Sequence, residues 1–201
     1  MKPFAVLILA AGFSRRMGQF KPLLTISGET IIDHLIVTFL TSKVEVHVVV
    51  GYRGQELIKA LKNREVTFVE NTDYAHGMFT SVQAGVRALK PGYEAFFVMP
   101  VDIPLVKTSS IQCLQKAYSE HPGKIIYPVF RTKRGHPPLI PMSLAPVIAE
   151  WTQDGSLRAV LSAHERLAIE VDINDENIVK DIDNVDDYHS LLESSHVKSQ
   201  Q

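Results

Sequence analysis

The stretch Phe4-Ala-Val-Leu-Ile-Leu-Ala-Ala-Gly-Phe-Ser-Arg-Arg-Met-Gly-Gln-Phe-Lys-Pro-Leu-Leu24 decides the fold, because in it an apolar run leads directly into a basic loop. The run at residues 4–10 predicts a strand that is buried on both faces of a sheet. It is too short to cross a bilayer, which needs about 20 apolar residues. The polar and basic residues 12–21 also differ from a signal-peptide cleavage region. We therefore expect no membrane partner.

Three further apolar runs bounded by turn residues occur at residues 44–50, 66–69 and 95–99. Between these runs, apolar residues recur with the i, i+3, i+4 spacing of amphipathic helices, and further helices are expected at 79–89 and 109–118. Strands and helices therefore alternate through the first 120 residues. This alternation predicts an α/β fold with a doubly wound, mostly parallel sheet.

The pattern changes after residue 120. Residues 124–130 and 138–140 predict strands on either side of the basic turn at 131–135, which indicates a small antiparallel excursion. No linker interrupts the chain, so we expect one domain at 1–193 and a flexible tail at 194–201. The other expected elements are helices at 143–151, 156–163 and 185–192, and strands at 167–171 and 178–182.

The composition is that of an ordinary globular protein with one core, because the chain has 201 residues, of which 45% are hydrophobic and 21% charged. The 21 Lys and Arg residues nearly balance the 22 Asp and Glu residues, giving a net charge of -1. This balance excludes a globally cationic nucleic-acid coat protein, and we expect no nucleic-acid partner. The single Cys113 cannot form an internal disulfide, so a reducing compartment, the cytoplasm, is expected.

The charges are unevenly placed along the chain. Residues 1–28 contain four basic residues and no acid, whereas residues 170–188 contain eight acids against Lys180 alone. The basic residues of the first segment are Lys2, Arg15, Arg16 and Lys21. The near-neutral chain thus has a cationic head and an acidic segment near its end.

The first loop has the character of a binding site for a small polyanion. In an open α/β sheet, ligands bind at the carboxyl ends of strands. Small residues at 10–12 allow close approach to the backbone, and Arg15, Arg16 and Lys21 provide cations suited to a triphosphate. The spacing matches neither the ATPase phosphate-binding loop nor G-x-G-x-x-G. A surface turn with solvated basic residues is the alternative.

The segment from Leu9 to Leu24 resembles the L-A-A-G-x-S-x-R-M-G-x-x-K-x-L-L signature of the MobA-like nucleotidyltransferases, in particular the molybdenum cofactor cytidylyltransferase branch. The resemblance implies a Rossmann-like nucleotidyltransferase fold whose first loop wraps the nucleotide. Arg16 and Lys21 would bind phosphates and act in catalysis, and Ala11 favours CTP over GTP. The nucleotide-binding residues implied in this loop are Leu9, Ala10, Ala11, Gly12, Ser14, Arg15, Arg16 and Lys21.

A second segment, residues 71–85, follows the third predicted strand and opens a helix. It resembles the family's G-M-x-x-S-x-x-x-G segment, which contacts the base and ribose, so Gly77 and Ser81 are expected to bind the nucleotide. The alternative is a polar loop that only caps the helix.

Asp102 follows the fourth predicted strand, between Pro100 and Pro104. Carboxylates suit Mg²⁺, which commonly binds one or two of them together with substrate phosphates. Asp102-Ile-Pro resembles the family's D-M-P, which favours a catalytic metal ligand over a simple turn residue. Asp181 and Asp183 lie in a segment similar to D-I-D-T-P-E-D and are expected to complete the metal site, although Asn184 and Val185 replace Thr and Pro there. For Asp186 and Asp187, the alternative is a favourable interaction with a helix N-terminus.

Gly135 and His136 lie in a segment that resembles the family's G-H-P motif, near the second substrate. His136 either binds the acceptor phosphate or fixes the turn, and the sequence favours neither.

Together the motifs predict Mg²⁺-dependent transfer of CMP from CTP to molybdopterin with release of pyrophosphate. Alternatives within the enzyme class are a guanylyltransferase that uses GTP and a sugar-phosphate nucleotidyltransferase. A non-catalytic nucleotide-binding accessory protein that serves assembly of a molybdenum hydroxylase is the alternative from another class. In either case a molybdenum hydroxylase or its chaperone is a possible partner.

Overall fold

A computed structural model of the chain describes residues 3–153 and 155–198. The apolar run near the N-terminus forms a strand in the interior of its sheet. Strand β1 (Phe4–Leu9) is buried at all six positions. It pairs in parallel with β4 (Glu45–Val50) on one side and with β6 (Ala95–Pro100) on the other. The predicted buried central strand is therefore confirmed.

The described residues form one eight-stranded sheet in the order β10-β7-β9-β6-β1-β4-β5, with β8 paired to β7. Only β8 and β9 run antiparallel to their neighbours in it. This confirms the α/β fold class, a mostly parallel sheet with an antiparallel excursion. The remaining strands of the sheet are β5 (Thr67–Glu70), β7 (Ile125–Phe130), β8 (Lys133–Arg134), β9 (Leu139–Pro141) and β10 (Ala168–Asp172).

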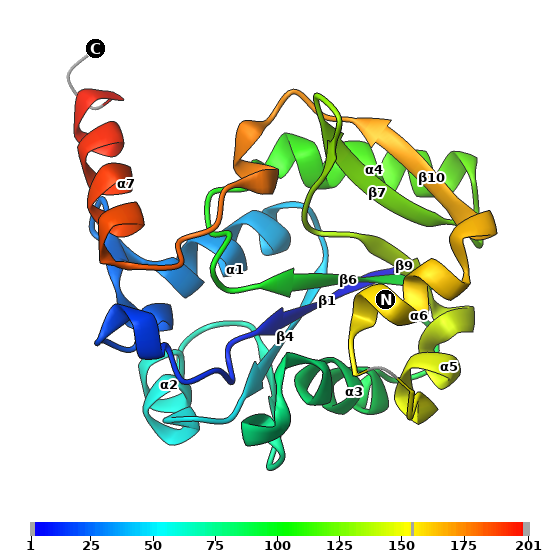
Figure 1. Cartoon of the computed structure of the whole chain (residues 1–201), viewed down its shortest axis with the longest axis horizontal. Coiled ribbons are helices and arrows are strands. Elements are labelled where there is room, and N and C mark those ends of the chain that lie inside the picture. Colours follow the sequence, from blue (N-terminus) through cyan, green and yellow to red (C-terminus); the bar gives the residue numbers. More distant parts are fainter. Residues whose placement is uncertain (1–2, 154, 199–201) are drawn as a thin grey trace.

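Helices cover both faces of the sheet (Figure 1) because side chains of β1 alternate between two apolar clusters. Val6 and Ile8 pack with Phe39 in the first cluster, while Leu7 packs with Val86 in the second. The first face carries α1 (Ile31–Thr41), α2 (Gly54–Ala60) and α4 (Thr108–Glu120), and the second carries α3 (Met78–Ala88), α5 (Ala145–Glu150) and α6 (Leu157–Ala163). None of the described helices is long and apolar enough to span a membrane.

The last helix, α7 (Val185–Lys198), stands at one end of the molecule (Figure 1). It packs beside the small hairpin of β2 (Thr25–Ile26) and β3 (Glu29–Thr30), and the Tyr188 hydroxyl donates to the Thr25 carbonyl at 2.6 Å. The helix extends beyond the predicted residues 185–192. Residues 199–201 of the expected tail, like Lys2, lie outside the described residues, and the boundary at 193 stays a prediction.

The strand expected at 178–182 is wrong. Residues Glu176–Val179 form a 3-10 helix, and the chain then runs extended without a strand partner. Its backbone groups are bound elsewhere: the Ile178 carbonyl accepts from His136 N at 2.7 Å, and Ile182 N donates to the Asp102 carbonyl at 2.8 Å. The buried Asp175 carboxylate caps this turn by accepting from Asn177 N. The apolar side chains that suggested a strand pack into two apolar clusters instead, Ile178 and Val179 into one and Ile182 into another.

His47 is an unusual polar residue inside the sheet. It lies on β4, is only 2% exposed, and its Nε2 lies 3.2 Å from the Tyr93 hydroxyl, while Nδ1 has no hydrogen-bond partner among the residues that the structure describes. Burial lowers the pKa of His47 and outweighs the opposing effect of Glu45. Protonation is therefore easier in the unfolded chain than in the folded protein.

We expect the free energy of unfolding to fall as the pH decreases below about 6.5, the ordinary histidine pKa, because the unfolded state then binds more protons. Through His47, the free energy of unfolding falls by at most about 1.4 kcal/mol per pH unit. This decrease stops once the pH is below the pKa of His47 in the folded protein. Urea unfolding between pH 7 and 5 measures it, and a His47→Gln variant should give a shallower dependence. Identical slopes in the two proteins would contradict this role.

Candidate functional site

A cavity of about 280 Å³ lies beneath the first loop, at the carboxyl ends of β1 and β6. Apart from Arg15 and Arg16, the residues expected to bind a nucleotide gather there from two distant parts of the chain. Its lining includes Leu9, Ala10, Ala11, Gly12, Ser14, Lys21, Gly77, Ser81 and Asp102.

Lys21 is held in this cavity by the fold of the loop. Its backbone N–H donates to Ser14 Oγ at 3.1 Å, and Ser14 itself has a left-handed backbone with φ of 53°. The buried side chains of Met17 and Phe20 anchor the loop between these two residues. Lys21 is 9% exposed, and within the described ranges its ammonium has no hydrogen-bond or ion-pair partner. A buried cation of this kind is available for an anionic ligand.

The two arginines of the loop do not line this cavity. The Arg15 guanidinium lies over the Phe13 ring, 4.5 Å from its centroid, and faces a separate hollow on the outer side of the loop. Arg16 donates to the Asp183 carboxylate at 2.7 Å. Two residues that the sequence assigns to phosphate and metal binding thus neutralise each other.

The backbone around the cavity leaves space for a ligand. A Cβ atom added at Gly12 would meet no protein atom within 4 Å. On the opposite wall, Gly77 has φ of 110°, a conformation that favours glycine, and α3 begins directly after it without a side-chain cap. The positive end of this helix therefore lies at the cavity.

Ser81 is oriented by Asn71, a buried residue that the sequence pattern did not single out. Asn71 Nδ2 donates to both Thr80 Oγ1 and Ser81 Oγ at 2.9 Å. The Thr80 hydroxyl donates to main-chain carbonyls, whereas that of Ser81 has no acceptor among the described residues. The Ser81 hydroxyl is thus free to donate into the cavity. An Asn directly after a strand was the only available signal for Asn71.

Asp102 lies in the turn after β6, where its carboxylate borders the cavity. Burial raises the pKa of Asp102, and the negative charges of Asp183 and Asp181 raise it further. The charge of Lys21 acts in the opposite direction. The acids from the end of the chain therefore lie close enough to act on Asp102 electrostatically.

A second cavity, of about 370 Å³, adjoins the first and shares Met78, Pro100 and Asp102 with it. Its other wall comes from the hairpin after β7 and from the segment before α7. The additional lining residues are Ile103, Lys133, Arg134, Gly135, His136, Ile178, Val179 and Asp181. The structure thus brings Gly135 and His136 beside Asp102.

The turn at Gly135 is closely packed against the late segment. A Cβ atom at Gly135 would lie 2.5 Å from the Ile178 carbonyl oxygen, so no larger residue fits without movement. His136 Nδ1 is buried without a hydrogen-bond partner among the described residues, and burial lowers the pKa of its ring. The hydrogen bond from His136 N to Ile178 further fixes this turn.

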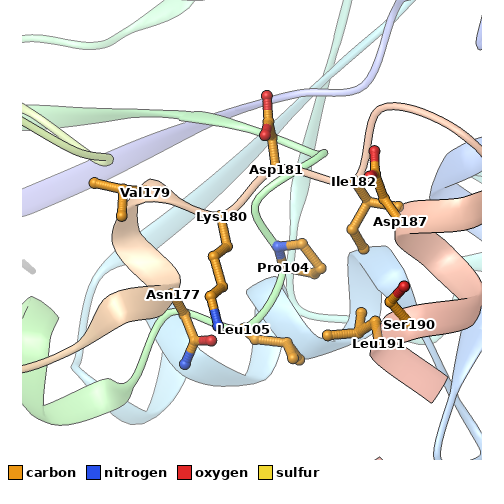
Figure 2. Close-up of a pocket in the computed structure, with 10 residues that line it drawn as sticks. All are labelled: Pro104, Leu105, Asn177, Val179, Lys180, Asp181, Ile182, Asp187, Ser190 and Leu191. Carbon is orange, nitrogen blue, oxygen red and sulfur yellow. The ribbon is translucent and has the colours of Figure 1, made fainter. Parts of the chain in front are cut away.

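A third cavity, of about 350 Å³, lies between α7 and the loop after β6 (Figure 2). Two of its charged side chains are occupied: Lys180 pairs with Glu176 at 2.8 Å, and Asp187 accepts from the backbone N–H groups of residues 183 and 184. Figure 2 shows the Asp181 carboxylate directed away from Lys180. Asp187 thus caps α7.

Among the described residues, no group of three or more His, Cys, Asp or Glu side chains is arranged to hold a metal ion. Asp102 and Asp181 share the second cavity, and Asp183 is engaged with Arg16. The protein thus offers carboxylate oxygens but no complete cage.

Comparison with known proteins relates this geometry to a family. Residues 6–167 match the MobA-like NTP transferase domain. The chain belongs to this family. It is 32% identical to the molybdenum cofactor cytidylyltransferase of Escherichia coli K12, covering 96% of this chain and 97% of the relative. It is also 28% identical to the nicotine blue oxidoreductase of Paenarthrobacter nicotinovorans, covering 92% and 94% respectively.

Solved structures share the fold of this chain. A nucleotidyl transferase from Methanothermobacter thermautotrophicus superposes with a TM-score of 0.82 at 21% identity, covering 97% of this chain and 98% of that one. The Rv0371c protein of Mycobacterium tuberculosis, solved in complex with manganese, gives 0.70 at 18% identity, covering 94% and 97%. These likenesses establish the fold.

Replacement of glycine by alanine should affect stability differently at positions 135 and 12. Gly135→Ala should lower the free energy of unfolding by about 1–3 kcal/mol, because the added methyl group is forced against the Ile178 carbonyl. Gly12→Ala should change it by less than about 0.5 kcal/mol, because the methyl group enters open space. Urea unfolding measures both. A marked loss in Gly12→Ala would mean that the protein itself needs glycine there.

Proposed function

We propose that this protein transfers a nucleoside monophosphate, CMP from CTP, to the phosphate of a molybdopterin-type acceptor and releases pyrophosphate. The proposal agrees with the family and with the name of the Escherichia coli relative. The observation that carries it is the buried side chain of Lys21, whose ammonium has no partner in the described part of the chain and which lines the same cavity as Asp102. Asp102 in turn borders the second cavity, which provides room for an acceptor.

The residues of the first cavity would bind and orient the nucleotide. The Lys21 ammonium offsets charge on the triphosphate, and the uncapped N-terminus of α3 adds a positive partial charge. The Ser81 hydroxyl would donate a hydrogen bond to the nucleoside part of the nucleotide, and the absence of a side chain at Gly12 leaves room for it against the wall of the cavity. Positioning of this kind supplies much of the rate in phosphoryl chemistry, where little covalent work falls on side chains.

The reaction joins the contents of the two cavities. An oxygen of the acceptor phosphate attacks the α-phosphorus of CTP, a new P–O bond forms, and the bond to the β-phosphate oxygen breaks. Pyrophosphate leaves with the electron pair of that bond. The acceptor phosphate is already ionised near pH 7, so no side chain has to remove a proton from it.

A divalent cation, Mg²⁺, fits the donor set at the boundary of the cavities. Asp102 and Asp181 offer hard carboxylate oxygens, and the mutual repulsion of the acids around Asp102 favours a cation between them. One or two protein carboxylates together with substrate phosphates are the usual ligands of Mg²⁺. When bound, the ion would stabilise negative charge on the reacting phosphates. A structural relative solved with manganese is consistent with this expectation.

Incubation with Mg²⁺, molybdopterin and either CTP, GTP or ATP should release pyrophosphate fastest with CTP. The Asp102→Asn variant preserves the shape of the side chain but removes its charge, and we expect its turnover to fall by about 100-fold or more. Its urea midpoint should stay near that of the wild type.

Absence of pyrophosphate with every nucleotide would contradict the enzymatic proposal, and preference for GTP would reverse the base assignment. Near-normal turnover in Asp102→Asn would mean that this carboxylate does not serve the reaction.

The ion pair between Arg16 and Asp183 gives a separate prediction. In EDTA, Asp183→Asn should tighten CTP binding by up to about fivefold, because an exposed ion pair of up to about 1 kcal/mol no longer competes for Arg16. Calorimetric titration measures the change, and Asp186→Asn, three residues further along in the first turn of α7, is the matched control. If CTP binding to Asp183→Asn were unchanged or weaker, Asp183 would not compete with the phosphates of CTP for Arg16.

A further inference from the structure

The second cavity has a charge distribution that restricts what it can bind. Two carboxylates, Asp102 and Asp181, belong to its lining, and two cations, Lys133 and Arg134, face it from β8. An anionic ligand that approaches Asp102 therefore meets fixed negative charge unless a cation on the other wall is available.

Arg134 is already committed to other groups. Its Nε donates to Glu170 at 2.6 Å, its terminal nitrogens bind both oxygens of Glu165, and its guanidinium lies 4.3 Å from the centroid of the Tyr127 ring. Two carboxylates thus neutralise this one cation. Arg134 shapes the wall of the cavity but contributes no net positive charge to it.

Lys133 is different, although it is the adjacent residue. It lines the same cavity, and in the part of the chain that the structure describes its ammonium has neither an ion pair nor a hydrogen bond. Its backbone is fixed because β8 pairs with β7, with Lys133 opposite Phe130. The hairpin therefore presents a free cation at the cavity from a defined position.

We propose that Lys133 binds the phosphate group of the acceptor in the second cavity and makes this cavity selective for phosphate monoesters. The inference rests on the proposed function and adds a residue and a substrate class to it. A charge-assisted hydrogen bond from the ammonium would offset the repulsion between the acceptor phosphate and the carboxylates at Asp102. The acceptor would thus be held on its own cation, separate from Lys21, which serves the nucleotide.

Arg131 provides a matched control on the same hairpin. Its guanidinium lies over the Phe130 ring at 5.2 Å from the centroid, and it is absent from the lining of the cavity. Lys133→Gln and Arg131→Gln each remove one positive charge from neighbouring positions. Only the first removes a charge that faces the cavity.

In the pyrophosphate assay, Lys133→Gln should raise the KM for the acceptor by about 10- to 100-fold, the range expected when one hydrogen bond to a charged group is lost. The KM for CTP should stay within about twofold of wild type, and Lys133→Arg should restore most of the acceptor affinity. Arg131→Gln should behave as wild type. Equal effects of the two Gln variants, or an unchanged acceptor KM in Lys133→Gln, would overturn the proposal.

A binding experiment without turnover separates this inference from the proposed reaction. Phenyl phosphate is titrated in a Lys21→Gln background, which removes phosphate binding in the first cavity, and ³¹P NMR reports its affinity. We expect at least tenfold weaker binding when Lys133→Gln is added and no change when Arg131→Gln is added. This result would support Lys133 even if no nucleotide were turned over. No difference between the two variants, or no binding to the Lys21→Gln protein, would overturn the assignment.

Discussion

The site depends on the position of β1 between two parallel strands. Leu9 at the end of β1 pairs with Pro100 of β6, Val101 N donates to the Leu9 carbonyl at 3.3 Å, and Ala10 N donates to the Val49 carbonyl at 2.9 Å. These bonds place the first loop beside the turn that carries Asp102. Because strand order reverses next to β1, the two loops diverge above the sheet and leave a cavity between them.

The parts of this arrangement that could be predicted from the sequence are those determined by local pattern. A run of apolar residues at 4–10 leaves few alternatives to a buried strand, and the next three runs repeat the signal. Since parallel strands end at the same edge, Lys21, Ser81 and Asp102 could be placed together from their position after these strands. All three line the first cavity.

Features that depend on contacts between distant segments could not be predicted in this way. The residues at 178–182 have the apolar spacing of a strand, but the Asp175 cap and the bonds to His136 and Asp102 determine their conformation. Arg16 has the sequence context of a phosphate ligand, yet its partner Asp183 lies 167 residues away. No local pattern indicates such a pair, because either residue alone would be a solvated charge.

The cationic head and the acidic segment of the chain meet at this edge of the sheet, but they do not cancel completely. Arg16 is neutralised by Asp183 and Arg134 by Glu165 and Glu170, whereas Lys21 and Lys133 have no partner among the described residues. One of these lysines lines each cavity, and Asp102 lies at the boundary. Ion pairing neutralises Arg16 and Arg134, so within the two cavities the attraction for anions is concentrated at Lys21 and Lys133. Such a distribution suits a protein that must hold two mutually repelling phosphates close together, because each phosphate has its own cation.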